Sequence, residues 1–566
     1  MVKRLALILL LTIPSFWVLL KPGYYNMHDD LQLIRQLELE KCIYDGQIPC
    51  RWVPDLGNGY GYPLFNFYPP MPYMVGEIYR TLGASFITTV KLTAVTQIIL
   101  ASFAMYLLVT SLLGPTAGII AAVFYTYAPY HAVNIYVRGA MDEAWATVFF
   151  PLLFYASYQL IATKKTKFII IFALAIAGIL LSHNPMVLIF TPFLLLWIFF
   201  WLISQKKAAF FIHDSYNFIK AGILGLGLSA FFTIPLLIET QLVQIESMFN
   251  DYYSYGAHFV TLPQLLFNNF WGDGPSVWGA NDGFSFMLGY LHWIIPLILL
   301  IFTIIKSINK RRFDRKSSLI IFLVGCFLFS AFMTHNRSNI IWLIFSPIQK
   351  IQFPWRFLSL SYFFASFASA FIVEVLNYIK ITSFLKKVII INLLVSVIVI
   401  NISYFQPVHS GPITDQQKFS GSWHNFVTGS IYDYLPKTAH TAPLTLATSI
   451  VDTQSPPNSS QITNTKRGTD WFSFNVTNEI TSTLTVAQLY FPNFIAYDNQ
   501  KIIPLTYEAT YGRMQIILPP GKHQLYFKLQ NTIIRTVCNY ISFVSWLLIA
   551  FYFTKSLWPT LKKSKK

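Results

Sequence analysis

The sequence predicts a polytopic α-helical membrane protein that carries a β-sandwich near its C-terminus. Of the 566 residues, 54% are hydrophobic and only 11% are charged, a balance that excludes a soluble globular protein of this size. Repeated apolar runs are long enough to cross a hydrocarbon core, which takes about 20 helical residues. After residue 405 these runs stop until near the C-terminus, and short stretches of alternating polar and apolar residues replace them.

About twelve apolar runs are predicted to span the membrane. They lie near residues 5–20, 86–112, 117–136, 143–162, 167–183, 186–203, 218–238, 286–305, 319–334, 354–377, 388–405 and 539–556. Two further apolar pieces, around 63–79 and 340–348, contain prolines or are too short to cross. We expect these two pieces to be re-entrant or interfacial segments.

The distribution of Lys and Arg predicts that both termini are cytoplasmic. With that orientation, the basic loops all fall on one side, which is the pattern expected of cytoplasmic loops. The net charge of +17 is then mostly a topology signal and requires no nucleic-acid partner. The first run also has the basic start of a signal peptide, but no small-x-small cleavage site follows it. We therefore expect a multi-pass protein of the cytoplasmic (inner) membrane whose large loops are extracytoplasmic.

The chain divides on this interpretation into three parts. Residues 1–405 form the membrane domain, 406–538 an extracytoplasmic β-sandwich, and 539–566 a last span with a basic cytoplasmic tail. Alternating stretches at 471–476, 483–489, 514–518 and 524–529 predict strands. The segment Pro519-Pro520-Gly521-Lys522 predicts a turn between the last two.

The first outer loop, residues 21–85, is too long for a simple connection. Residues 30–41 show a helical period with one apolar side, which predicts a helix lying on the outer leaflet. The segment 58–73 is rich in Gly, Pro and aromatic residues, and fits either an interfacial anchor or a platform for sugars. Cys42 and Cys50 would form a disulfide in an oxidising compartment, although two free thiols fit equally well.

The predicted topology places ionisable residues from distant parts of the sequence on the outer side of the membrane. One acidic pair, Asp29-Asp30, follows the first span, and a second, Asp142-Glu143, precedes the fourth. The basic candidates at the same side are Arg138, His183 and Arg356. Ionisable groups near the membrane are costly and usually functional. Each of these residues also has a structural explanation. The acids would cap helices, the arginines would anchor the protein at lipid headgroups, and the histidine would make a contact at a helix end.

Together these motifs resemble the GT-C glycosyltransferases. The resemblance rests on the Asp pair after the first span, the long first outer loop, and the acidic pair between the third and fourth spans. More narrowly, residues 58–73, 138–143, 353–356, 490–494 and 518–523 resemble bacterial membrane proteins labelled "6-pyruvoyl-tetrahydropterin-synthase-related", although no His triad supports pterin chemistry. The resemblance implies inverting transfer of a sugar from a polyprenyl-phosphate carrier to an acceptor at the extracytoplasmic face.

The resemblance also implies roles for individual residues. Asp29 or Asp30 would be the base that takes the acceptor's proton. The leaving phosphate requires hydrogen-bond donors, for which the arginine fork is well suited. The expected substrate- and phosphate-binding residues are Arg138, His183, Arg356, Asn66 and Tyr68.

A divalent cation such as Mg or Mn is a further expectation, with Asp30, Asp142 and Glu143 as ligands. The implied partners are membrane lipid, a polyprenyl-phosphate sugar, and a glycan, lipid or protein acceptor. Two other functions compete with this interpretation: a transporter or flippase of lipid-linked glycan, and a non-catalytic scaffold of envelope assembly. A transporter requires polar residues near the bilayer midplane. Because the predicted topology places the polar residues at one face of the membrane and not at its midplane, the pattern favours an enzyme.

Overall fold

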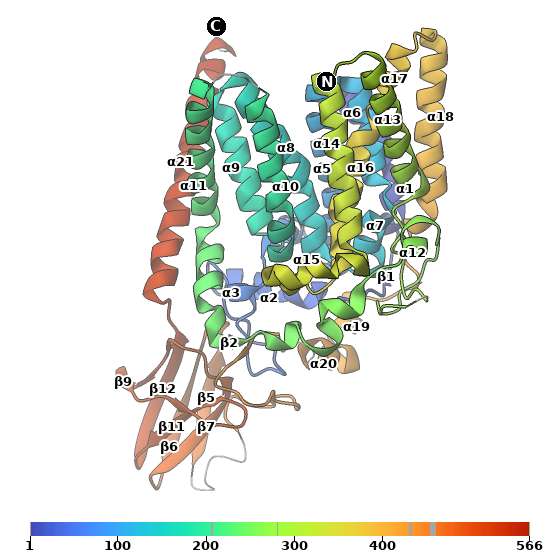
Figure 1. The fold of residues 1–566 in the computed structure, drawn as a ribbon. Helices are drawn as coiled ribbons and strands as arrows, with labels where there is room; N and C mark the ends of the chain where they lie inside the picture. The colour runs from blue at the N-terminus through green and yellow to red at the C-terminus, as the bar shows by residue number, and fades with distance from the viewer. Residues whose placement is uncertain (1, 205–207, 280, 430–432, 453–459, 565–566) are drawn as a thin grey trace. The chain divides into compact units, whose positions relative to one another are not determined.

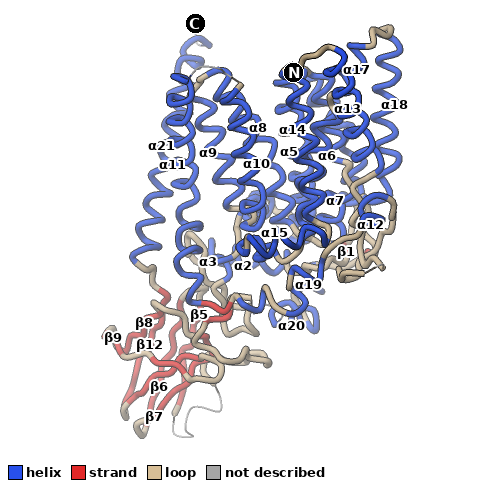
Figure 2. The backbone as a smooth tube through the Cα atoms, viewed as in Figure 1, coloured by secondary structure: helices blue, strands red, loops and turns tan. Residues whose placement is uncertain are grey.

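The computed structural model describes residues 2–204, 208–279, 281–429, 433–452 and 460–564. It confirms a polytopic helical membrane protein with a β domain towards the C-terminus (Figures 1 and 2). Within these ranges, ten helical segments are long and apolar enough to cross a membrane. They are Val2–Leu20, Phe86–Leu113, Met141–Thr163, Asn184–Ile203, Ser215–Leu242, Tyr290–Asn309, Arg315–Met333, Pro354–Tyr378, Ser383–Tyr404 and Ile533–Lys555.

The other two predicted spans are shorter helices, α6 (Pro115–Thr126) and α9 (Thr166–Leu180). The prediction of one continuous span over 117–136 is wrong, because α6 ends at Thr126. Pro129 explains the break, since a proline pushes the preceding residue away from helical geometry, and Ala128 has φ −66° and ψ 131°. The chain continues as α7 (Pro129–Ala132) and a π-helical turn, η2 (Val133–Val137).

The chain forms two compact units, and each is assembled from separate stretches of sequence. Unit 1 comprises Met1–Asp30, Ile87–Leu226 and Phe249–Pro412, and unit 2 comprises Leu31–Phe86, Gly227–Met248 and Ile413–Lys566. These boundaries cut across the sequence-predicted divisions at 405 and 538. Unit 2 takes in most of the first outer loop and the last helix together with the β-strands.

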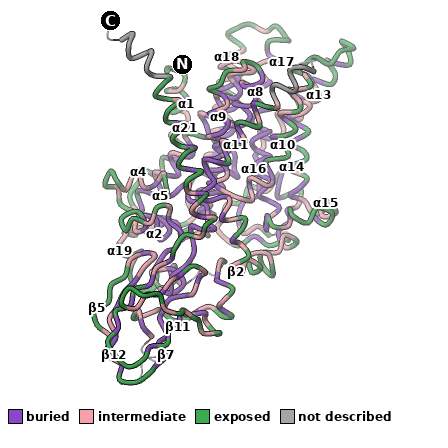
Figure 3. The backbone as a smooth tube through the Cα atoms, turned by 90° about the vertical axis from the view of Figure 1, so that its left-hand side faces the viewer, coloured by how far each residue is buried: buried purple, intermediate pink, exposed green. Residues whose placement is uncertain are grey.

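Unit 1 is a bundle of long helices that run side by side (Figure 1). Its central helix, α16 (Leu358–Ser369), is buried along its whole length (Figure 3) and packs against α6, α13 and α14. The main helices are α1 (Val2–Phe16), α5 (Phe86–Leu113), α8 (Met141–Thr163), α10 (Asn184–Ile203), α13 (Tyr290–Asn309), α14 (Arg315–Met333), α17 (Ile372–Tyr378) and α18 (Ser383–Asn401). Shorter elements are η1 (Trp17–Leu20), β1 (Tyr24–Tyr25), η5 (Asp251–Tyr253), η6 (Tyr255–His258), α12 (Leu262–Leu266), η7 (Asn336–Ser338), α15 (Asn339–Ile344), η8 (Ser346–Ile351), η9 (Pro354–Phe357), η10 (Ile402–Tyr404) and β3 (Ser410–Gly411).

Helix α11 (Ala208–Glu239) contributes its last residues to unit 2. The other helices, short turns and small strands of unit 2 are α2 (Gln32–Tyr44), α3 (Leu64–Phe67), α4 (Met71–Thr81), η3 (Thr240–Leu242), β2 (Val243–Gln244), η4 (Glu246–Met248), α19 (Asp415–Lys418), α20 (Gly421–Gly429), β4 (Leu435–Pro436) and α21 (Ile533–Ser564). The two pieces expected to be re-entrant form α3 and α4 in unit 2, and α15 and η8 in unit 1. All four are too short to cross a bilayer, and their re-entrant placement stays a prediction.

The β domain consists of two antiparallel sheets, as expected for a sandwich. The five-stranded sheet has the order β5 (Gln461–Arg467), β6 (Trp471–Asn478), β12 (Gly521–Leu529), β8 (Phe494–Asp498) and β9 (Lys501–Ile503). The three-stranded sheet has the order β10 (Thr506–Tyr507), β11 (Arg513–Leu518) and β7 (Ser482–Leu489). All four strands expected from alternation are present, and the turn at 519–520 is confirmed. Apolar side chains from both sheets share one core.

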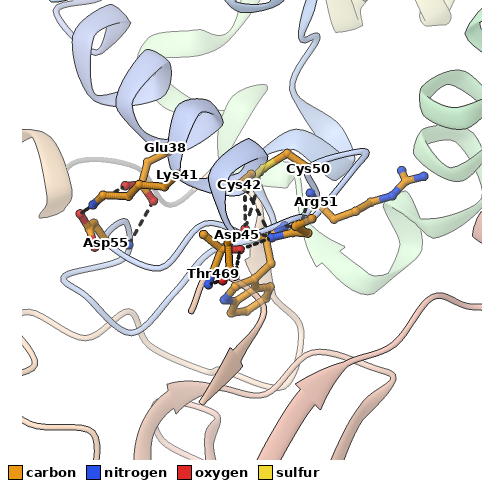
Figure 4. Close-up of a disulfide and its surroundings, with 10 residues drawn as sticks. Glu38, Lys41, Cys42, Asp45, Cys50, Arg51, Asp55 and Thr469 are labelled. Carbon is orange, nitrogen blue, oxygen red and sulfur yellow. Dashed lines mark hydrogen bonds and ion pairs between the residues drawn. A yellow bond between two sulfur atoms is a disulfide. The ribbon is translucent and has the colours of Figure 1, made fainter. Parts of the chain in front are cut away.

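Helix α2 confirms the helix expected in the first outer loop, but its polar side is not open to solvent. Arg35, Gln36 and Glu38 are buried together with the apolar residues. The helix is therefore enclosed by protein on more than one face, and its placement on a leaflet stays a prediction. Cys42 at the end of α2 is disulfide-bonded to Cys50 (Figure 4).

Three charged residues beside this disulfide form a compact cluster. Lys41 Nζ donates to Glu38 Oε1 at 3.2 Å and also to an oxygen of Asp55 (Figure 4). Glu38 is fully buried, so two carboxylates share one ammonium group in a largely enclosed setting. Burial, and then the neighbouring Asp55 charge, raise the pKa of Glu38 above its usual value of 4.5.

The raised pKa of Glu38 leads to a pH-dependent prediction. A carboxyl whose pKa is higher in the folded state contributes stability at low pH, and this contribution is lost as the pH rises through the folded pKa. We expect Glu38→Gln to match wild type near pH 5 and to be more stable near pH 9, by on the order of 1–2 kcal/mol. Thermal unfolding of both proteins across this range measures the difference. A Glu38→Gln protein that is less stable near pH 9 would contradict it.

Candidate functional site

The first acidic pair lies beside the loop that carries Arg138. The backbone N–H of His28 donates to Val137 O at 2.9 Å, and that of Asp29 donates to Arg138 O at 2.9 Å. These two hydrogen bonds place Asp29 next to the turn between η2 and α8. Asp29 is partly buried, and its charge is one of those that act on the Arg138 guanidinium. Asp29 thus lies close to Arg138, and their shared catalytic site stays a prediction.

The backbone around Arg138 is fixed by two local features. The π-helical turn η2 ends immediately before it, and such turns are frequent at functional sites. Gly139 follows with φ +62°, and a Cβ at this position would collide with the side chain of Met27. Glycine is the residue that tolerates this conformation and this close approach. Arg138 is thus presented by a tight turn directly ahead of α8.

Glu143, in the first turn of α8, holds two guanidinium groups. Its Oε2 accepts from Arg138 Nη1 at 2.7 Å and from Arg356 Nε at 3.3 Å. Its Oε1 accepts from Tyr130 Oη at 2.8 Å, Ser359 Oγ at 3.2 Å and Asn134 Nδ2 at 3.3 Å. The carboxylate is wholly buried, and both arginines are at most 8% exposed.

This arrangement excludes Glu143 as a general base. A carboxylate that accepts five hydrogen bonds is held as an anion and oriented by its donors. Two arginines share this one glutamate, and the Asp29 charge also acts on Arg138. Burial would lower the pKa of Arg138, but the Glu143 charge outweighs it and the net shift is upward. Arg138 is therefore a permanent cation.

Part of each guanidinium remains available to a ligand. The three side-chain hydrogen bonds of Arg138 all leave from Nη1. Those of Arg356 leave from Nε to Glu143 and from Nη1 to Ile351 O and Gln352 Oε1, at 2.6 and 2.9 Å. Among described residues, neither Nη2 has a hydrogen-bond acceptor. Two such guanidinium nitrogens in one site can donate to phosphate oxygens.

His183 lies close to this cluster but is a neutral helix cap. Its Nδ1 accepts from the backbone N–H of Met186 at 3.2 Å, at the start of α10. Burial, and then the Arg356 charge, lower the pKa of His183 to about 3. Because Nδ1 is an acceptor, the proton of the neutral ring is assigned to Nε2. His183 can donate one hydrogen bond to a ligand but brings no charge.

The second aspartate of the first pair has a different neighbour from the first. The Asp30 carboxylate is hydrogen-bonded to the hydroxyl of Tyr24, a fully buried residue. Burial, followed by the Asp30 charge, raises the pKa of Tyr24 well above its usual range. Asp29 is thus associated with the arginine cluster, and Asp30 with a tyrosine. This difference in environment was not apparent from the sequence.

The candidate metal ligands do not form a recognisable metal site. Asp142 is buried beside Glu143 at the start of α8. No group of three or more His, Cys, Asp or Glu side chains suited to a metal ion occurs among the described residues. Glu143 is already engaged by two arginines, and the predicted divalent cation stays a prediction.

Asn66 and Tyr68 belong to unit 2, where both make internal contacts. Asn66 Nδ2 donates to Glu239 Oε2 at 2.8 Å and its Oδ1 accepts from Arg51 Nη1 at 3.2 Å. Tyr68 Oη accepts from Arg35 Nη1 at 2.7 Å, and the guanidinium also lies over the ring, 4.1 Å from its centre. Both side chains therefore have structural partners, and their predicted substrate role stays a prediction.

A small cavity adjoins the arginine cluster. It measures about 10 Å³ and is lined in part by Gln97, Asn134, Gly139 and Trp145. A cavity of this size holds about one water molecule. Its lining is mostly apolar, and it has no room for a sugar ring.

Sequence reasoning missed three members of the cluster, Tyr130, Asn134 and Ser359. Tyr130 and Asn134 precede Arg138 by eight and four residues, a spacing that a helix continuing through this segment would have placed on one face. Ser359 follows the Phe-Pro-Trp-Arg stretch by three positions. The sequence indicates these three residues only by their polar side chains, which lie in otherwise apolar surroundings.

Comparisons with known proteins give distant similarities. No known family profile matches the chain. The chain is 25% identical over 241 residues to an uncharacterized protein of Lactococcus lactis subsp. cremoris (strain MG1363), a match that covers 41% of this chain and 39% of that protein.

Two solved structures show a low structural similarity. The Archaeoglobus fulgidus oligosaccharyltransferase in its apo form has a TM-score of 0.43 at 13% identity, over 79% of this chain and 60% of that one. The mycobacterial arabinofuranosyltransferase AftD has a TM-score of 0.42 at 14% identity, over 73% of this chain and 27% of that one. The chain thus spans less than two thirds of the length of each of these three proteins. These similarities assign no activity to this chain.

Proposed function

We propose that this protein is an integral membrane glycosyltransferase that moves a sugar from a polyprenyl-phosphate carrier to an acceptor at the extracytoplasmic face. The observation that carries the proposal is the position of Asp29 beside Arg138, one of two arginines that the buried Glu143 holds in place. A carboxylate base beside a cationic phosphate site is the pair of functions that this reaction requires.

In the proposed reaction, Asp29 accepts the proton of the acceptor hydroxyl. The acceptor oxygen attacks the anomeric carbon, and the bond from that carbon to the phosphate oxygen breaks with inversion. The bonding electrons leave with the lipid phosphate, whose charge increases as the bond lengthens. The Nη2 groups of Arg138 and Arg356 donate to this phosphate, and Glu143 keeps both guanidiniums in position. Glu143 is thus a positioning residue.

The location of the site suits a lipid-borne phosphate. Arg138 lies just before the span Met141–Thr163, and Arg356 at the start of the span Pro354–Tyr378. Span ends lie at the depth of lipid headgroups, where a polyprenyl phosphate presents its charge. A flippase would place polar groups near the middle of spans instead. The position at helix ends therefore supports an enzyme over a transporter.

The proposal is tested by incubating the purified protein in lipid nanodiscs with labelled polyprenyl-phosphate sugars and envelope acceptors. Wild type is expected to transfer label, and parallel reactions with EDTA or added Mg or Mn test the predicted cation. We expect Arg138→Lys to reduce transfer about 10²-fold to 10³-fold, because lysine keeps the charge but loses the planar fork. Arg337→Lys, at an exposed arginine of η7, is the control. Wild-type transfer by Arg138→Lys would contradict the phosphate role.

A further inference from the structure

The guanidinium of Arg138 lies over the indole ring of Trp355. Its central carbon is 4.4 Å from the ring centre, and a cation over a tryptophan ring is attracted to it, more strongly where water is excluded. Both side chains are buried. The three acceptors of Nη1 hold the guanidinium at one edge, and Trp355 supports its face. The direction of Nη2 of Arg138 therefore depends on where the indole lies.

Trp355 is held in turn by the loop between α12 and α13. Its Nε1 donates to Ser276 Oγ at 3.2 Å. Phe284 and Phe286 of the same loop lie against the indole, with ring centres 5.4 and 6.3 Å away. Phe353 stacks on the indole at 4.6 Å. A buried indole N–H requires an acceptor, and Ser276 supplies it.

The hydroxyl of Ser276 is oriented by His258 of η6. His258 Nε2 lies against the carbonyl oxygen of Tyr252, and a carbonyl oxygen only accepts, so the proton of the neutral ring is assigned to Nε2. Burial lowers the pKa of His258, which favours this neutral ring. Nδ1 is then an acceptor, 2.8 Å from Ser276 Oγ. Ser276 thus donates to His258 and accepts from Trp355.

The backbone of the loop is fixed close to Ser276. Gly274 N donates to Gly283 O at 2.8 Å, and a Cβ on Gly283 would collide with the backbone opposite. On its other side, the loop contacts the segment that carries the proposed base. His28, which precedes that base, donates from Nε2 to Asp273 O at 2.8 Å. The loop is therefore anchored beside the site at two points.

We propose that Ser276 is a positioning residue of the phosphate site, which acts through Trp355 on Arg138. This inference rests on the phosphate role of Arg138 in the proposed function. Without the Ser276 hydroxyl, the indole N–H loses its acceptor and His258 loses its donor, so the indole shifts to regain a partner. Arg138 keeps its charge and its pairing with Glu143. The direction of Nη2 is lost, and the site is weakened but not abolished.

The experiment measures binding by the full-length protein in nanodiscs with two probes, farnesyl phosphate and farnesol, which differ only in the phosphate. Wild type is expected to bind farnesyl phosphate at least about 10-fold more tightly than farnesol. Ser276→Ala should weaken farnesyl phosphate binding about 5-fold to 10-fold and leave farnesol binding unchanged. Trp355→Phe keeps a ring but lacks the N–H, and should also weaken farnesyl phosphate binding. In the Trp355→Phe protein, Ser276→Ala should add less than about 2-fold, because the hydrogen bond is already absent.

Ser330→Ala is the matched control, because Ser330 is a buried serine of α14 whose hydroxyl donates to a backbone oxygen. Thermal unfolding checks that each variant is folded. Ser276→Cys, which is close in size but a weak donor and acceptor, gives the same comparison if Ser276→Ala does not fold.

Three results would overturn the proposal: unchanged farnesyl phosphate binding by Ser276→Ala, an equal loss of farnesol binding, or an effect of Ser276→Ala that is as large in the Trp355→Phe protein as in wild type. Equal binding of the two probes by wild type would overturn both this proposal and the phosphate role of Arg138. If the expected differences are found but wild type transfers no sugar, the positioning role stands and only the glycosyltransferase assignment fails.

Discussion

Asp29→Asn is expected to reduce sugar transfer about 10²-fold to 10⁴-fold, the usual contribution of a positioned general base. The amide has almost the same shape as the carboxylate but cannot accept the acceptor's proton. The backbone hydrogen bond from Asp29 to Arg138 does not involve the side chain, so the fold should be preserved. The measurement is the initial rate of label transfer from a polyprenyl-phosphate sugar, together with binding of the unreactive polyprenyl phosphate.

Asp30→Asn is the matched control for this substitution. Asp30 is hydrogen-bonded to Tyr24, and an amide oxygen can still accept from that hydroxyl. We therefore expect Asp30→Asn to retain most of the transfer rate. If Asp30→Asn is inactive and Asp29→Asn is active, the assignment of the base is reversed. If both variants are fully active, the first-loop acids take no part in the chemistry.

The second large effect, a loss of stability, is expected on substitution of Glu239, which lies in a buried polar cluster of unit 2. Glu239 Oε2 accepts from Arg535 Nε at 2.8 Å and from Asn66 Nδ2 at 2.8 Å, and Oε1 accepts from Thr532 Oγ1 at 3.0 Å. Arg51 joins the cluster through Asn66. Glu239, Arg535, Arg51 and Asn66 are all at most 4% exposed. The cluster links the first outer loop and the ends of α11 and α21.

Glu239→Ala is expected to destabilise unit 2 by about 3–5 kcal/mol, because it leaves two buried guanidiniums without their anion. Thermal or denaturant unfolding in detergent, followed through the spectroscopic signal of the β-strands, measures the loss of unfolding free energy. The combined change Glu239→Leu with Arg535→Met should recover part of it, since only one buried guanidinium, that of Arg51, then remains without the anion. Glu374→Ala removes the partly exposed ion pair with Lys316, and should cost less than about 1 kcal/mol. Equal losses for Glu239→Ala and Glu374→Ala would contradict this prediction.

Much of the fold could be predicted from local patterns. Membrane helices are specified by their own apolar composition, so each of the twelve apolar runs except 117–136 corresponds to one main helix. Strands β6, β7, β11 and β12 follow from alternation, which also marks the residues that enter the core. The break after Thr126 was missed because its cause, Pro129, lies within an apolar run that remains hydrophobic on both sides.

The candidate site could be predicted only in part. Topology brought Asp29, Arg138, Glu143 and Arg356 to one side of the membrane, because each lies near the end of a span. Which side chains pair depends on contacts between distant segments, and no local pattern encodes them. Two examples are the hydrogen bond of Asn66 to Glu239 and the pairing of Glu143 with two arginines. The predicted ligand roles of both residues stay predictions.

The most direct test of the central claim is an experimental structure of the protein with a bound polyprenyl phosphate. The account predicts phosphate oxygens within hydrogen-bonding distance, about 3 Å, of Nη2 of Arg138 and Nη2 of Arg356, with the Asp29 carboxylate facing the same ligand. A phosphate bound elsewhere, with both arginines still engaged only by Glu143 and their present neighbours, would contradict it.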